Sequence, residues 1–456
     1  MGNYDLIVIG GGPAGYLGAI RAAQAGKKVA LFEERALGGV CLNEGCIPSK
    51  ALLNSSKMLD HAKNGKRYGV LATDVRIDQG AVIARKNKVV KQLTAGIGMS
   101  MKALKVEVIE GSAKISPKDE NLFVVSANSK EYKAVNLLIA TGSKPILPPI
   151  QGLKEALDSG FALTNREILD LEEIPENLAV IGGGIIGLEM ASYYNSVGSN
   201  VTVIEMLDKI AGPTEEEVSD ILFKNLKRQR ISFEMSSKVT AIGEKSVSFE
   251  KDGHEKEIIC DKVLLSVGRS PNIDNLGLEN IAVHTEKGAI ITDEKMQTNI
   301  PGVYAAGDVN GKSMLAHTAY RESEVAINNI CKKADTMDYS AVSSVIYTNP
   351  EVAGVGETLK SALEKGYEAK SFSVSMRMSG RYMAETDGGN GIAKLIVDMK
   401  TNRLLGVHLI GTYTSEIIYG AALMLETKIS IENIKKLIFP HPTVGEAIRE
   451  ALFEIN

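Results

Sequence analysis

The sequence is poor in several features that would indicate particular classes of protein. It contains no Trp and only four cysteines in 456 residues, too few to stabilise a secreted protein of this size. No run of five or six like charges occurs, and the net charge is only −4, which disfavours a nucleic-acid partner. There is no stretch of 18 apolar residues and no signal-peptide pattern, so we expect no membrane span. These absences predict a globular protein in a reducing compartment, the cytoplasm.

One strand-turn-helix-strand pattern occurs twice. In the first copy, an apolar run at residues 4–9 precedes a glycine-rich turn and a helical stretch, and the next apolar run ends at Glu33. In the second copy, the runs lie at residues 178–181 and 200–204, and the acid is Glu205. The glycines of the two Gly-x-Gly-x-x-Gly turns are Gly10, Gly12 and Gly15, and Gly182, Gly184 and Gly187. Each landmark recurs after 172 residues, which predicts two βαβ nucleotide-binding units.

Each position of this pattern has a physical purpose. The first glycine permits a tight turn, the second lets a pyrophosphate approach the backbone, and the third lets helix and strand pack closely. The helix N-terminus then faces the phosphates, and the acid accepts hydrogen bonds from a ribose. Glu205 is followed by Met206, Leu207 and Asp208, with no Arg to bind a 2′-phosphate. The second unit is therefore predicted to bind NAD rather than NADP.

The remaining sequence suggests how these units are connected. Apolar runs at residues 135–139 and 262–267 end in glycine turns and are expected to be strands, and Pro-containing segments at 145–149 and 270–272 are expected to cross between domains. Residues 302–307 form a similar run before Asp308, which could bind a cofactor hydroxyl or cap a helix. After residue 341, strand-like runs (394–397, 404–410) alternate with helical stretches (415–427, 446–453). We predict an α/β protein with two Rossmann-like domains (1–148 with 272–340, and 149–271) and a C-terminal α+β domain (341–456).

Two of the four cysteines, Cys41 and Cys46, directly follow the first fingerprint. Their spacing suits a small disulfide loop or half of a metal site, but no second ligand pair is present, so no metal is predicted. Pro48 suits the first turn of a helix, which places Cys46 just before the helix N-terminus. There the helix dipole and Lys50 favour a thiolate, as dithiol–disulfide exchange requires. The alternative is a pair of buried structural cysteines, and Cys260 and Cys331 are expected to be inert.

A base for such exchange must titrate near neutral pH, which favours histidine. Among six histidines, His441 stands out because Pro440 and Pro442 restrict its backbone. Glu446 follows five residues later, where its carboxylate could orient the imidazole. A solvated or structural histidine is the alternative at any single position.

These motifs together resemble a known enzyme family. Residues 38–50 (Gly-Gly-Val-Cys-Leu-Asn-Glu-Gly-Cys-Ile-Pro-Ser-Lys), the two fingerprints, and His441-Pro442-Thr443 with Glu446 are similar to the dihydrolipoamide dehydrogenases. These are the lipoamide-oxidising members of the FAD-dependent pyridine nucleotide–disulfide oxidoreductases. The resemblance extends from about residue 3 to residue 452.

The resemblance implies roles for individual residues. Cys46 would lie against the flavin of FAD, Cys41 would meet the substrate, and Lys50 by the flavin would pair with Glu189. His441 and Glu446 would form an acid–base dyad that serves the disulfide of the other subunit of a homodimer. The implied FAD contacts are Gly10, Gly12, Gly15, Glu33, Lys50, Ala113, Thr141, Gly142, Ser143, Asp308, Met314, Leu315, Ala316 and His317. The implied NAD contacts are Gly182, Gly184, Gly187, Glu189, Glu205, Val239 and Gly268.

The activity implied by the resemblance is oxidation of protein-bound dihydrolipoamide through the Cys41–Cys46 disulfide, with transfer of the electrons through FAD to NAD⁺. The implied partner is the lipoyl domain of a 2-oxo acid dehydrogenase, acetoin or glycine cleavage system. A glutathione-reductase-like enzyme is the alternative, but such enzymes use NADPH, and Glu205 disfavours it. A nucleotide-binding subunit without turnover is a second alternative.

Overall fold

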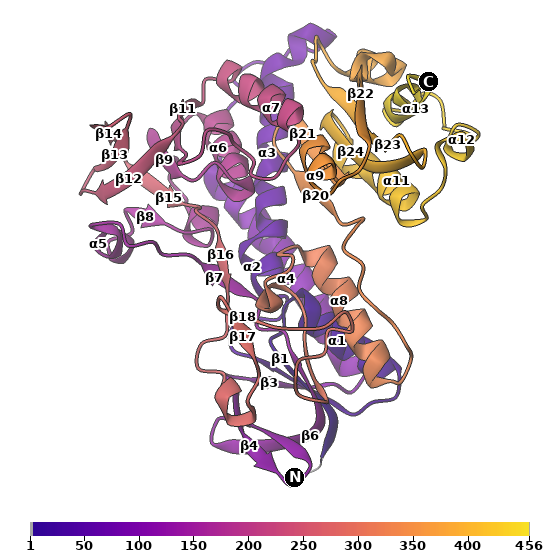
Figure 1. The fold of residues 1–456 in the computed structure, drawn as a ribbon. Helices are drawn as coiled ribbons and strands as arrows, with labels where there is room; N and C mark the ends of the chain where they lie inside the picture. The colour runs from indigo at the N-terminus through magenta and orange to yellow at the C-terminus, as the bar shows by residue number, and fades with distance from the viewer. Residues whose placement is uncertain (1–2, 456) are drawn as a thin grey trace. The chain divides into compact units, whose positions relative to one another are not determined.

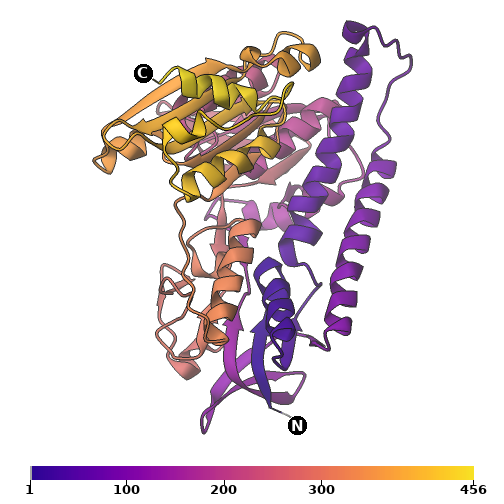
Figure 2. The same ribbon diagram turned by 90° about the vertical axis from the view of Figure 1, so that its right-hand side faces the viewer.

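The computed structural model describes residues 3–455, which form two compact units (Figures 1 and 2). The first unit contains the described residues up to Ala51, together with Ala81–Leu147 and Gly268–Asp338. The second contains Leu52–Gly80, Pro148–Val267 and the residues from Tyr339 onward. Each unit is built from segments that are far apart in the sequence. The domain boundaries given above stay a prediction.

The first unit is organised around a seven-stranded sheet. Its parallel part consists of β3 (Glu107–Glu110), β2 (Val29–Glu33), β1 (Tyr4–Ile9), β6 (Lys130–Ile139) and β19 (Val303–Ala305). The hairpin strands β5 (Leu122–Ala127) and β4 (Lys114–Asp119) extend it antiparallel to β6. Helix α1 (Pro13–Gln24) packs against α8 (Ala316–Ile330) beside the parallel strands. Strand β1 is buried on both faces, which explains its nearly continuous apolar sequence.

The second unit contains a five-stranded parallel sheet in the order β11 (Ser232–Glu234), β10 (Asn200–Ile204), β9 (Asn177–Ile181), β15 (Lys262–Leu265) and β8 (Ala162–Leu163). Helix α6 (Ile185–Val197) connects β9 to β10, as α1 connects β1 to β2. Helix α7 (Glu216–Arg228) follows, and then an antiparallel sheet of β12 (Ser237–Ile242), β13 (Ser246–Lys251) and β14 (His254–Ile259). The repeated βαβ unit is thus present in both units.

The C-terminal part of the second unit is a five-stranded antiparallel sheet. Its order is β20 (Ser343–Ile346), β21 (Glu351–Gly356), β24 (Arg403–Gly411), β23 (Ile392–Asp398) and β22 (Ala369–Ser375). Helices α11 (Thr414–Glu426) and α13 (Glu446–Phe453) pack on this sheet and close one apolar core (Figure 2). The predicted fold class is therefore confirmed. The antiparallel strands β4, β5 and β12–β14 were not predicted, nor was the long helix α4 (Gln79–Ala103).

Among the helices of residues 3–455, none is long and apolar enough to cross a membrane.

Candidate functional site

The first fingerprint turn shows why each of its glycines is needed. Gly10 has a φ of +103°, and a Cβ there would lie 2.3 Å from the carbonyl oxygen of Ala140. A Cβ on Gly15 would lie 1.8 Å from the carbonyl oxygen of Gly10. A Cβ on Gly12, in contrast, would meet nothing closer than the Cα of Gly39, at 3.8 Å. The chain itself requires the first and third glycines, while the second leaves open space in which a pyrophosphate fits.

The second fingerprint turn repeats this arrangement. A Cβ on Gly182 would lie 2.5 Å from the carbonyl oxygen of Ser266, and one on Gly187 would lie 2.1 Å from that of Gly182. A Cβ on Gly184 would have no heavy atom within 4 Å. Both turns therefore combine a close-packed interior with an open middle glycine at the start of a helix, which suits a bound dinucleotide.

The two predicted acids are held in the same way. Glu33 accepts hydrogen bonds from the backbone N–H of Gly11 at 2.7 Å and of Arg35 at 2.8 Å. Glu205 accepts them from Gly183 at 2.6 Å and from Leu207 at 2.8 Å, which are the positions 172 residues later. Each carboxylate thus lies beside the second residue of its fingerprint, at the end of the second strand, where a ribose is bound in this fold.

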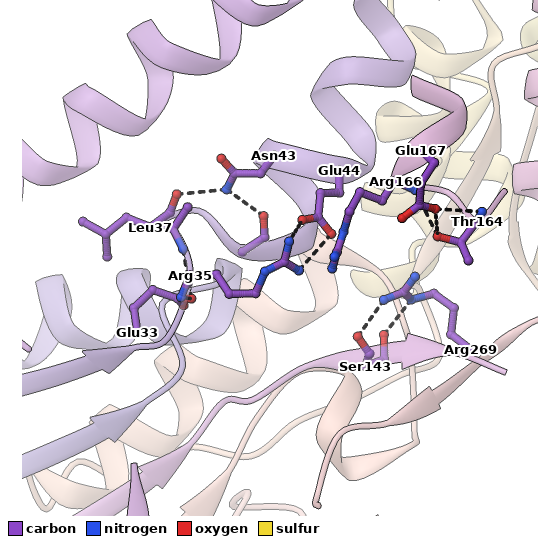
Figure 3. A network of polar contacts seen from close by, with 12 residues as sticks. Glu33, Arg35, Leu37, Asn43, Glu44, Ser143, Thr164, Arg166, Glu167 and Arg269 are labelled. Carbon is purple, nitrogen blue, oxygen red and sulfur yellow. Dashed lines mark hydrogen bonds and ion pairs between the residues drawn. The ribbon is translucent and has the colours of Figure 1, made fainter. Parts of the chain in front are cut away.

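A third group of predicted residues meets at the carboxyl ends of β6 and β19. The hydroxyl of Ser143 donates a hydrogen bond to Asp308, and Thr141 donates to the carbonyl oxygen of Asn272 at 2.6 Å. Burial raises the pKa of Asp308, although the Ser143 hydroxyl and the charge of Arg269 act against this shift. Arg269 donates to the Ser143 hydroxyl at 2.7 Å and to its carbonyl oxygen at 2.6 Å (Figure 3). Arg269 was not predicted as a site residue, and its only signal was its place after Gly268.

The other predicted cofactor residues lie within or next to regular elements. Ala113 directly precedes β4, Val239 lies in β12, and Gly268, with a φ of +114°, follows β15. Residues 314–317 lie at the N-terminus of α8, which begins at Ala316.

The dithiol lies at the junction of two helices. Cys41 is in α2 (Gly39–Glu44), and Cys46 is the first residue of α3 (Cys46–Asn64), so the helix begins at Cys46 itself rather than just after it. The two cysteines are not joined in a disulfide, and Cys46 is exposed while Cys41 is partly buried. The hydrogen bond with Cys46 and burial raise the pKa of Cys41, while the charge of Lys50 acts in the opposite direction. These interactions favour the thiol form of Cys41 over the thiolate.

Glu189, the predicted partner of Lys50, is buried in α6, and its carboxylate accepts a hydrogen bond from the backbone N–H of Tyr347 at 3.0 Å. The pairing of Lys50 with Glu189 stays a prediction.

His441 and Glu446 are in direct contact, as predicted from their spacing. Nδ1 of His441 lies 2.8 Å from Oε1 of Glu446, whose Oε2 accepts the backbone N–H of Thr443 at 2.9 Å. Both contacts lower the pKa of Glu446, the one with Thr443 more strongly. The side chain of His441 is 76% exposed. The imidazole is therefore oriented from one side and presented outward on the other.

Family models match both parts of the chain. The pyridine nucleotide–disulphide oxidoreductase model covers residues 4–323, and the dimerisation-domain model of the same family covers residues 342–452. The chain belongs to this family. Its members use FAD and NAD(H), and this chain is an FAD-dependent, NAD-linked disulfide oxidoreductase with a dimerisation domain.

Individual relatives agree with this assignment. A dihydrolipoyl dehydrogenase of Rhizobium etli is 37% identical over 99% of this chain and 98% of its own length. The dihydrolipoyl dehydrogenase of Thermus scotoductus is 38% identical over 99% of this chain and 97% of its own. The solved structure of the HOCl-induced flavoprotein disulfide reductase RclA from Escherichia coli matches with a TM-score of 0.86 and 25% identity, over 99% of this chain and 100% of that one. The resemblance to the dihydrolipoamide dehydrogenases is therefore confirmed.

Proposed function

We propose that this oxidoreductase oxidises dihydrolipoamide and reduces NAD⁺. The observation that carries the proposal is the Cys41–Cys46 pair at the start of α3, in the same compact unit as the first fingerprint. The nearly full-length similarity to enzymes named dihydrolipoyl dehydrogenase supports this choice of substrate.

The two cofactors are assigned to the two fingerprints. The first, with Glu33 and Asp308, holds FAD, and the second, with Glu205, holds NAD. The open middle glycines, Gly12 and Gly184, receive the pyrophosphates. When bound there, FAD would supply the two-electron redox chemistry that links the dithiol to NAD⁺.

The protein residues carry out the thiol chemistry. In the oxidised enzyme, a substrate thiolate attacks Cys41 of the Cys41–Cys46 disulfide and releases Cys46 as a thiolate. The second substrate thiol then displaces Cys41 and gives it a proton, which completes the ring of lipoamide and leaves Cys41 as a thiol and Cys46 as a thiolate. His441 accepts the proton from the attacking thiol, and Glu446 holds its tautomer. The N-terminus of α3 and Lys50 favour the thiolate form of Cys46.

The exposure of His441 in a single chain supports a role across a dimer interface. We infer that the histidine of one subunit of a homodimer serves the disulfide of the partner subunit, and that the substrate is a lipoyl domain of a 2-oxo acid dehydrogenase, acetoin or glycine cleavage system. We also propose that the protein is located in the cytoplasm. The proposed domain boundaries lie after residues 148, 271 and 340.

The test is an anaerobic assay of the purified flavoprotein with dihydrolipoamide and NAD⁺, beside NADP⁺, and beside glutathione disulfide with NADPH. We expect rapid NAD⁺ reduction by dihydrolipoamide alone, and its loss in Cys41→Ser and Cys46→Ser variants. Cys260→Ser is the matched control, because Cys260 is buried and distant in sequence from the motif. Turnover with glutathione disulfide instead would support the glutathione-reductase-like alternative, and full lipoamide turnover by either active-site variant would exclude the scheme.

A further inference from the structure

Asp308 lies at a fixed position in the first unit. It begins the short helix η4 (Asp308–Asn310), and two residues separate it from the end of β19. The preceding loop is clamped from α8, because Glu322, which is fully buried, accepts the backbone N–H of Gly307 at 2.6 Å and the side-chain amide of Asn310 at 2.9 Å. The backbone that carries Asp308 therefore has little freedom. The function of Asp308 then depends on the protonation and the orientation of its carboxylate.

The hydroxyl of Ser143 joins Arg269 to Asp308 through two hydrogen bonds. A guanidinium can donate hydrogen bonds but cannot accept them, so the Ser143 oxygen accepts from Nε of Arg269 at 2.7 Å. The single hydroxyl hydrogen of Ser143 is then available for Oδ2 of Asp308. A hydrogen bond donated to Oδ2 stabilises the ionised form of the carboxylate. Arg269 thereby acts on Asp308 through Ser143, although no direct contact between the two is needed.

The surrounding structure holds this arrangement in place. Arg269 begins β16 (Arg269–Pro271), which pairs antiparallel with β7 (Ser143–Pro145). A second hydrogen bond, from Arg269 to the Ser143 carbonyl oxygen at 2.6 Å, fixes the plane of the guanidinium. Asn272 donates its backbone N–H to the carbonyl oxygen of Gly142 at 2.9 Å, which ties the turn before Ser143 to the residue after β16.

We propose that Arg269 is a positioning residue for FAD, which acts through Ser143 to keep Asp308 ionised and oriented as an acceptor for a cofactor hydroxyl. The inference rests on the proposed placement of Asp308 at the FAD site. The Arg269–Ser143–Asp308 relay opposes the effect of burial, which raises the pKa of Asp308. Without the relay, Asp308 takes up a proton at a higher pH and offers one acceptor fewer.

Other charges near Asp308 do not substitute for Arg269. The carboxyl group of Glu322 on α8 is engaged by the loop backbone, and Lys144 on β7 is paired with Asp274. Arg269 is therefore the positive group whose charge acts on Asp308. We expect the pH dependence of FAD binding to change when Arg269 is replaced.

The experiment measures the dissociation constant of FAD for the refolded or deflavinated full-length chain between pH 5 and 8, by quenching of flavin fluorescence. We expect Arg269→Gln and Ser143→Ala each to weaken binding by about tenfold, the loss associated with one charge-assisted hydrogen bond. As the pH falls, FAD binding by these variants should begin to weaken at a higher pH than FAD binding by the parent protein. Ser143→Thr, which keeps the hydroxyl, should restore binding to near the parent value.

The double variant Arg269→Gln/Ser143→Ala distinguishes a relay from two separate contributions. A relay predicts that the double variant binds FAD about as weakly as either single variant, whereas independent contacts predict that the losses add. Arg21→Gln is the control, because Arg21 lies in the same unit and pairs with Glu324 on the surface. Additive losses, or parent-like FAD binding by Arg269→Gln at every pH, would overturn the proposal. The measurement contains no lipoamide, so failure of the proposed substrate would leave this result unchanged.

Discussion

The carboxylate of Glu446 lies 2.8 Å from Nδ1 of His441 and also accepts the backbone N–H of Thr443. The second contact fixes the carboxylate within its own turn, so that it can hold the ring of His441 in one tautomer. Nε2 is then the nitrogen that can exchange a proton with a substrate thiol. The contact with Glu446 orients the ring of His441 before any substrate arrives. The side chain of His441 is also mostly exposed, so a substrate can reach it.

Replacing His441 by Gln should lower kcat/KM for dihydrolipoamide by about 10²-fold or more, the usual contribution of a general base. Glu446→Gln should have a smaller effect, because the amide oxygen can still accept a hydrogen bond from Nδ1. Reduction of an artificial electron acceptor by NADH serves as the control and should be retained in both variants. An unchanged kcat/KM for dihydrolipoamide in Glu446→Gln would contradict the orienting role.

The two kinds of fingerprint glycine should respond differently to substitution. Gly184→Ala places its methyl group in open space, so we expect an unchanged melting temperature but at least tenfold weaker NAD binding. Gly187→Ala places its methyl group 2.1 Å from the carbonyl oxygen of Gly182, which should destabilise the fold itself. Thermal unfolding without nucleotide and NADH titration separate the two effects. Equal loss of stability in both variants would show that the middle glycine is also structural.

Glu205 should determine the choice between NAD and NADP. Glu205→Gln keeps an acceptor oxygen for one of the two backbone N–H groups, those of Gly183 and Leu207, and removes the charge that repels a 2′-phosphate. We expect the ratio of kcat/KM for NAD⁺ over NADP⁺ to fall by about tenfold. Glu33→Gln is the matched control in the first fingerprint and should leave this ratio unchanged.

A buried ion pair connects α7 with the C-terminal sheet. Nζ of Lys394, only 9% exposed, lies 2.8 Å from Oε1 of Glu215, which is 5% exposed. Lys394→Met would leave Glu215 buried without its cation, and we expect a loss of about 3–5 kcal/mol in the free energy of unfolding. Lys365→Met breaks the exposed pair with Glu357 and should cost less than about 1 kcal/mol. Urea unfolding of the two variants checks this difference, and equal costs would contradict it.

The same pair predicts an effect of acid on stability. Burial alone would raise the pKa of Glu215, but the hydrogen bond and the charge of Lys394 outweigh it, and the pKa is lowered. A carboxyl group with a lowered folded-state pKa stabilises the protein above its unfolded-state pKa, and this contribution is lost as the pH falls through the folded-state pKa. The stability difference between the parent protein and Lys394→Met should therefore shrink on acidification below about pH 4.

The amino-acid sequence alone was sufficient to predict the features that depend on residues close together in the chain. The fingerprint turns, the start of α3 near Cys46, and the contact of His441 with Glu446 each lie within a short segment, where backbone geometry fixes which groups meet. The repeated βαβ unit was recognisable for the same reason, since its spacing recurs unchanged after 172 residues. Family resemblance added the roles of these residues.

Tertiary structure decided the contacts between distant segments. More than 100 residues separate Ser143 from Arg269 in the sequence. These two residues meet Asp308 only because β7 pairs with β16 and β19 pairs with β6. No local pattern marks Arg269 as a site residue, because its hydrogen bonds to Ser143 depend on the antiparallel pairing of β16 with the distant strand β7. The pairing of Lys394 with Glu215 has the same origin, since desolvated charges can be recognised only once packing has removed them from water.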